Sequence, residues 1–183
     1  LPSCDTISLG IQWVGDAETG TYSVLVAGDM DRDGIPEVVT YHTESTELFI
    51  IDGATGQTKF VIISPSAMAG GTAPAMADLD NDGFGEFVIV ANDRRIRCYG
   101  HTGLLKWTSP GLVGYGDRAR FAVPNIADFD HDGNPEINIG NQVFSGQTGA
   151  LLAEAGPGAS AGEHPARVAK NFSFASPVAM DVL

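Results

Sequence analysis

The sequence predicts an all-β protein built from repeated four-stranded antiparallel sheets. The main observation is an acidic nine-residue motif that occurs three times, beginning at Asp29, Asp78 and Asp128, which lie 49 and 50 residues apart. Between the copies, short runs rich in β-branched residues alternate with turn residues, and no helical period of 3.6 residues is sustained. The 23 glycines and 10 prolines among 183 residues also favour many turns and short strands over long helices.

Each copy of the repeat is expected to hold four strands, with the acidic loop after the first strand and a Gly-x-Thr-Gly turn after the third. This turn reads Gly53-Ala-Thr-Gly56, Gly100-His-Thr-Gly103 and Gly146-Gln-Thr-Gly149 in the three copies. The expected strands are 22–27, 37–41, 48–52 and 59–63, then 73–77, 87–91, 96–99 and 104–107, then 122–127, 137–140, 142–144 and 150–153.

A four-stranded meander repeated at this period is typical of a β-propeller blade. One such sheet cannot bury both of its faces alone, so blades stack face to face around an axis. Three complete copies do not close a ring, and the chain is therefore expected to form part of a larger one. The expected division is 1–21 as the outer strand of a preceding blade, carrying Trp13 as the second copy carries Trp107, then blades at 22–72, 73–121 and 122–174, and the start of a further blade at 175–183.

Charge and cysteine content exclude several classes of protein. The net charge of −13 argues against a nucleic-acid partner and against docking on anionic lipid, which both require a basic surface. No run of 18 apolar residues occurs, so membrane insertion is not expected. The two cysteines, Cys4 and Cys98, are open to either a disulfide or two free thiols. The chain begins at Leu1 without an initiator Met or a signal peptide, and we expect a mature product or a segment of something longer.

The acidic loops have the composition of calcium sites. Calcium takes six to eight oxygen ligands in forgiving geometry, and carboxylates at loop positions 1, 3 and 5 converge when the chain curls tightly. Glycine at position 6 permits that curl, position 7 can offer its carbonyl oxygen, and the acid at position 9 closes the shell. Position 4, which is His131 in the third copy, is expected to point outward.

The predicted calcium ligands form three sets of five. They are Asp29, Asp31, Asp33, Ile35 and Glu37, then Asp78, Asp80, Asp82, Phe84 and Glu86, then Asp128, Asp130, Asp132, Asn134 and Glu136. An EF-hand would place its closing glutamate at position 12 between helices, so this loop is a different one. Magnesium prefers octahedral geometry with retained waters, and zinc or copper would prefer His or Cys. The alternative to three Ca²⁺ sites is a merely acidic turn.

The motif Asp-x-Asp-x-Asp-Gly-x-x-Glu at this period resembles the FG-GAP/VCBS repeat family. That family includes the calcium-binding blades of the integrin α-subunit propeller and many secreted bacterial proteins. The segments Gly70-Gly-Thr-Ala-Pro74 and Phe84-Gly85 match the Phe-Gly and Gly-Ala-Pro signature loosely, which places the chain nearer the bacterial repeats. The resemblance runs from Tyr22 to the C-terminus and implies the same aspartate and glutamate ligands.

Two classes of function agree with this sequence. The first is a non-catalytic calcium-binding scaffold or recognition module for adhesion, surface assembly or glycan binding. Its partners would be an extracellular protein, a glycan or further blades. The second, which the resemblance brings in, is the propeller of a calcium-dependent polysaccharide lyase of the rhamnogalacturonan-lyase kind. No nucleophile motif and no rim cluster of His, Arg or Lys is evident, so we expect no catalytic residues and favour the first class. Modest-affinity calcium sites require extracellular calcium, so a secreted or cell-surface protein is expected.

Overall fold

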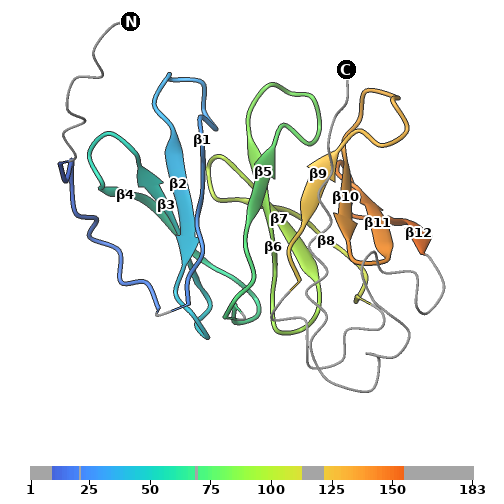
Figure 1. Cartoon of the computed structure of the whole chain (residues 1–183), viewed down its shortest axis with the longest axis horizontal. Coiled ribbons are helices and arrows are strands. Elements are labelled where there is room, and N and C mark those ends of the chain that lie inside the picture. The colour runs from blue at the N-terminus through green and yellow to red at the C-terminus, as the bar shows by residue number, and fades with distance from the viewer. Residues whose placement is uncertain (1–9, 21, 69, 113–121, 155–183) are drawn as a thin grey trace, which may run out of the picture.

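The computed structural model describes residues 10–20, 22–68, 70–112 and 122–154, whose twelve strands form three separate four-stranded antiparallel sheets. Within each sheet the strands lie in chain order (Figure 1). The first sheet holds β1 (Val26–Gly28), β2 (Glu37–Tyr41), β3 (Glu47–Asp52) and β4 (Thr58–Ile63). The second holds β5 (Ala75–Ala77), β6 (Glu86–Val90), β7 (Ile96–Gly100) and β8 (Leu105–Thr108), and the third β9 (Asn125–Ala127), β10 (Glu136–Ile139), β11 (Gln142–Ser145) and β12 (Leu151–Glu154).

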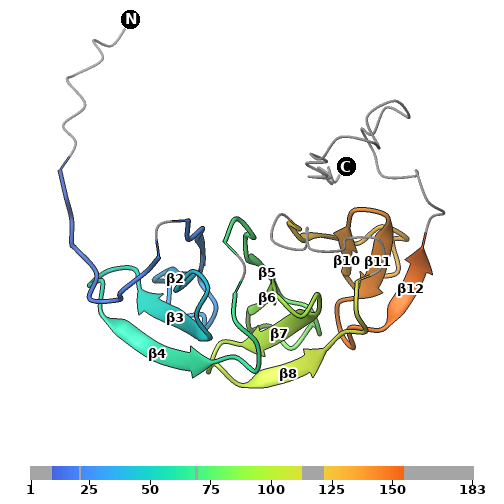
Figure 2. The ribbon, with the colours of Figure 1, turned by 90° about the horizontal axis from the view of Figure 1, so that it is seen from below.

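The three sheets stand side by side along an arc, with β4 and β8 on its convex edge (Figure 2). The first strands meet toward the inside, since β1 contacts β5 and β5 contacts β9. This is the arrangement of propeller blades around an axis. The predicted all-β fold with propeller blades is therefore confirmed, while closure into a larger ring stays a prediction.

The innermost strand of each blade is shorter than the sequence predicts. β1, β5 and β9 have three residues each, against five or six expected. Each pairs with a neighbour on one side only. In the second and third blades, Pro74 and Pro124 lie close before the strand, and proline has no N–H to donate to a ladder. The other nine strands agree with the predicted ranges to within one residue at each end.

Two hydrophobic cores lie between the three sheets. The middle sheet is covered on both faces, so every residue of β6 and β7 is buried. Side chains alternate across a strand, and Phe87 and Ile89 accordingly join the core with the first sheet, while Val88 and Val90 join the core with the third. Burial of each such side chain contributes about 1.5–3 kcal/mol. Blade stacking is thus a hydrophobic interaction, as the repeat predicts.

The Gly-x-Thr-Gly turns fasten each blade to its surroundings. The N–H groups of Gly53 and Gly146 donate to the carbonyl oxygens of Pro36 and Pro135, at 3.0 Å each, which ties the turn to the end of the acidic loop. Trp107 on β8 packs its ring over Gly149 and donates its indole N–H to the carbonyl oxygen of Gly146 at 3.0 Å, so it joins the second blade to the third.

Trp13 makes the same contact on the first blade. Its ring lies over Gly56 and its indole N–H donates to the Gly53 carbonyl oxygen at 2.8 Å. Residues 10–20 nevertheless contain no strand. The assignment of 1–21 to a preceding blade and the other blade limits stay predictions, and residues 1–9, 21 and 175–183 lie outside the described ranges.

Cys98 is a free, fully buried thiol in the core between the second and third sheets. Burial raises the pKa of this thiol far above its ordinary value. Cys4 lies outside the described residues.

The described part of the chain has no helix long and apolar enough to cross a membrane.

Candidate metal centres

The three acidic loops occupy the same place in each blade, between its first and second strands. Two residues in each loop adopt the left-handed conformation, at positions 4 and 6. The position-4 φ angles are 64° for Arg32, 59° for Asn81 and 61° for His131, and those of the position-6 glycines are 85° for Gly34, 90° for Gly83 and 89° for Gly133. Such angles are unfavourable for residues with a Cβ, which explains glycine at position 6.

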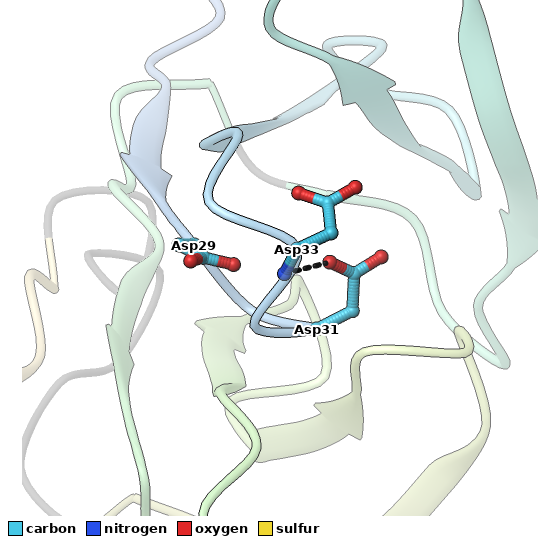
Figure 3. A group of neighbouring side chains, drawn as sticks. All are labelled: Asp29, Asp31 and Asp33. Atoms are coloured by element: carbon cyan, nitrogen blue, oxygen red, sulfur yellow. Dashed lines mark hydrogen bonds between the residues drawn. The ribbon is translucent and has the colours of Figure 1, made fainter.

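This curl brings the aspartates of the first loop together (Figure 3). One carboxylate oxygen from each of Asp29, Asp31 and Asp33 lies within 4.8 Å of the other two. Backbone N–H groups hold the side chains in place, since Gly34 donates to Asp29 Oδ2 at 3.1 Å and Ile35 donates to Asp33 Oδ1 at 2.7 Å. The cluster can hold a metal ion.

The second and third loops repeat this geometry. Asp78, Asp80 and Asp82 form the second cluster, and Asp128, Asp130 and Glu136 form the third, under the same 4.8 Å limit. Asp132 lies outside that group of three, although its Oδ1 accepts from the backbone N–H of Asn134 at 2.7 Å as its counterparts do. The predicted carbonyl ligands at Ile35, Phe84 and Asn134 stay predictions.

The second cluster contains oxygen atoms that lack a donor. Within the described residues, Asp78 Oδ1 and Asp80 Oδ1 are buried and accept no hydrogen bond. A buried carboxylate oxygen without a partner is costly, and a bound cation would remove that cost. These atoms therefore fit a metal ion better than they fit a plain acidic turn.

The glutamate at position 9 has a structural contact in addition to its predicted ligand role. Glu37, Glu86 and Glu136 are all buried at the start of the second strand. Oε2 of each accepts from the backbone N–H of loop position 2: from Met30 at 2.9 Å, from Leu79 at 2.8 Å and from Phe129 at 2.8 Å. One oxygen thus closes the loop onto the strand, and the other remains for a cation.

In the first two blades a lysine reaches that second oxygen. Lys59 Nζ lies 2.8 Å from Glu37 Oε1 and 2.7 Å from Asp31 Oδ2. Lys106 Nζ lies 2.7 Å from both Glu86 Oε1 and Asp80 Oδ2. The contact with Asp31, then that with Glu37, raises the pKa of Lys59, while Lys59 lowers that of Asp31.

Sequence reasoning missed both lysines. The signal that could have found them is their position, since each lysine stands three residues after the last glycine of its Gly-x-Thr-Gly turn. The third copy has Leu152 at that position. Burial and then the neighbouring aspartates raise the pKa of Glu136 above its ordinary value, and burial also raises the pKa of Glu86 despite its contact with Lys106.

Residues 29–89 match the family of FG-GAP-like repeats. The resemblance expected from the loop motif is thereby confirmed for the segment that spans the first two acidic loops. No curated protein matches the chain.

Solved structures resemble this chain in fold. The V. cholerae biofilm matrix protein Bap1 matches 72% of the chain at 22% identity with a TM-score of 0.52, and BBS1N in complex with ARL6DN matches 75% at 13% identity with a TM-score of 0.50. BamB from Moraxella catarrhalis matches 79% at 20% identity with a TM-score of 0.49. The chain spans only 19% of Bap1, 39% of BamB and 44% of BBS1N. The likeness to Bap1 and BBS1N concerns the fold alone.

Adjacent loops of the repeat also touch each other, through the position-4 side chains. Arg32 lies against Gly83, with its guanidinium 5.8 Å from the centre of the Phe84 ring. Asn81 Nδ2 donates to the Gly133 carbonyl oxygen at 3.0 Å and to Asn134 Oδ1 at 3.3 Å. The side chains of Arg32 and Asn81 at position 4 thus contact the next loop, because stacking of the blades places that loop within their reach.

Asn81→Gly is expected to destabilise the chain by about 1 kcal/mol, because it removes two hydrogen bonds between loops and keeps the left-handed backbone accessible. The matched control is His131→Gly, at the equivalent position. Among the described residues the His131 side chain has no such contact with another loop, and its replacement should change stability by less than about 0.5 kcal/mol. Urea unfolding of both variants measures the difference, and equal effects would contradict a coupling between loops.

Proposed function

We propose that the chain is a non-catalytic calcium-binding module of a secreted or cell-surface protein, in which Ca²⁺ stabilises each blade. The observation that carries this proposal is the second loop, where Asp78 Oδ1 and Asp80 Oδ1 are buried without a donor among the described residues. The same loop occurs in all three blades, so a single chance arrangement does not explain it.

Calcium suits these clusters better than other common cations. All the side-chain donors in the clusters are carboxylate oxygens, the hard ligands that calcium prefers. The loop backbone is curled around the carboxylates and can adapt to a coordination number of six to eight, whereas magnesium requires near-ideal octahedral geometry.

An extracellular setting supports filling of these sites. Modules of this type work at calcium concentrations of about 10⁻⁴–10⁻³ M, which occur outside cells. Bap1, whose fold is similar over 72% of the chain, is a biofilm matrix protein. We propose an extracellular protein or glycan, or further blades of the same ring, as the partner of this module.

Titration calorimetry tests the calcium proposal. Ca²⁺ is expected to bind with dissociation constants at or below about 10⁻³ M, and Mg²⁺ at least about tenfold more weakly. Asp80→Asn should remove one site, whereas Glu154→Gln, on the exposed strand β12, should remove none. A folded chain that binds no Ca²⁺ at millimolar concentration would overturn the proposal.

A further inference from the structure

The fourth strand of every blade carries an irregularity at the same point. Register shifts between Ile50 and Ile51 and between Cys98 and Tyr99 leave one residue of β4 and of β8 unpaired, and a shift between Val143 and Phe144 does the same for β12. The unpaired residues are Lys59, Lys106 and Leu152. A bulge of this kind re-aims its side chain, so these three positions are structurally equivalent.

The bulge residue determines whether the neighbouring loop has its own counter-ion. Lys59 and Lys106 each pair with the position-3 aspartate and the position-9 glutamate of their own blade, at 2.7–2.8 Å. Leu152 cannot form such a pair, and its side chain is 57% exposed. In each of the first two loops, one ammonium group thus lies beside four carboxylates and partly compensates their charge. In the third loop the residue at the same position is apolar and compensates none of it.

The third loop lacks the lysine that reaches the position-9 glutamate in the other two blades. Glu136 is 6% exposed and its Oε2 accepts from Phe129 N–H, and within the described ranges no lysine or arginine forms an ion pair with its carboxylate. The cluster formed with Asp128 and Asp130 includes this glutamate, whereas the clusters of the first two loops consist of aspartates alone. The glutamate that a lysine contacts in the other blades is here part of the group of carboxylates that could hold a metal ion.

Contacts from the neighbouring blade increase this difference in positive charge between the second and the third loop. The second loop receives the guanidinium of Arg32 near Gly83, but the third receives the neutral amide of Asn81. The third loop itself carries one basic residue, His131 at position 4. In the part of the chain that the structure describes, no lysine or arginine forms an ion pair with the third cluster.

We propose that the bulge residue sets the metal dependence of each blade. Lys59 and Lys106 act as built-in counter-ions that partly compensate the carboxylates of the first two loops, whereas the third loop has no such counter-ion, depends most on Ca²⁺ and binds it most tightly. The physical reason is that an ammonium group on the same carboxylates repels an incoming divalent cation and already compensates their charge. This inference rests on the proposed calcium-binding function. It adds that the three sites differ in their affinity for calcium.

Calorimetric titration of the full chain with Ca²⁺ tests the inference through four variants. Lys59→Met and Lys106→Met keep the length of the side chain and remove its charge, and each is expected to convert one weak site into a site about tenfold tighter. Leu152→Lys introduces the counter-ion at an exposed position and should weaken the tightest site by about tenfold. Arg94→Met is the matched control, because Arg94 is exposed on the β6–β7 connection at the opposite end of β6 from the acidic loop, and its loss should leave all affinities within twofold.

Melting of the metal-free variants provides the second measurement. Without calcium, Leu152→Lys is expected to melt higher than the parent chain, and the two Lys→Met variants lower. Leu152→Lys keeps the inference testable if a Lys→Met variant fails to fold. Three parent sites of equal affinity that none of the substitutions changes would overturn the inference and leave the calcium proposal intact. Absence of calcium binding in every variant would overturn the calcium proposal itself.

Discussion

Removal of calcium is expected to lower the melting temperature of the chain by about 5–10 °C for each site that was filled. A ligand that binds only the folded state stabilises it by about 2.7 kcal/mol at a hundredfold excess over its dissociation constant. For a chain of this size, each kcal/mol corresponds to about 2–4 °C. The acidic loop joins two strands of one sheet, so the carboxylates repel each other across that connection once the ion has left.

Differential scanning calorimetry in the presence of a chelator measures this effect. Excess Ca²⁺ should restore the transition, and the same concentration of Mg²⁺ should restore much less of it. Chelator already saturated with calcium is the control for effects of the chelator itself. A transition that stays at the same temperature after verified calcium removal would show that the ion has no structural role and would favour its direct use in ligand binding.

Glu86→Ala is expected to destabilise the chain by about 3 kcal/mol, even when calcium is absent. Glu86 is 1% exposed, and its loss leaves the Leu79 N–H buried without an acceptor. A buried unsatisfied group of that kind costs about 1–3 kcal/mol. The ammonium of Lys106 also loses one of its carboxylate partners, and the truncated side chain leaves a cavity.

Urea unfolding in chelator separates this structural effect from any effect on metal binding. Glu86→Gln keeps an acceptor for Leu79 N–H and should cost only about 1 kcal/mol, through the weakened contact with Lys106. Glu154→Ala, on the exposed strand β12, should stay within about 0.5 kcal/mol of the parent chain. If Glu86→Ala matched Glu154→Ala, the glutamate would act only as a metal ligand and would not close the loop.

The repeat made most of the fold predictable. The 49–50-residue spacing of the acidic motif, with alternating short strands and a shared Gly-x-Thr-Gly turn, led to three four-stranded sheets, and the structure has three. Strand β2 was predicted residue for residue because the loop motif marks its start and Glu37–Tyr41 is rich in β-branched residues. The short innermost strands were overestimated, since the amino-acid pattern does not show that β1, β5 and β9 pair on one side only.

The candidate site was predictable where its residues are close in the chain. The three aspartates of the first loop converge as the motif requires, because the left-handed Arg32 and Gly34 curl the loop locally. The lysines were not predictable in the same way. Lys59 meets Glu37 only because β3 lies between their strands and a bulge turns the side chain toward the loop. Contacts of Asn81 with the next blade similarly depend on how the sheets stack.

The bulge on the fourth strand also bears on how such repeats can diversify. Residues that shape the loop, such as Glu86 and Gly83, are tied into the backbone of the blade, so replacing them disturbs its folding. The bulge residue has no partner in the ladder, and Leu152 shows that the same backbone accepts an apolar side chain there. A single codon can therefore change the ionic requirement of one repeat while the copies beside it keep theirs. A tandem array duplicated from one ancestral unit could in this way acquire repeats with stronger and weaker calcium dependence without any change in architecture.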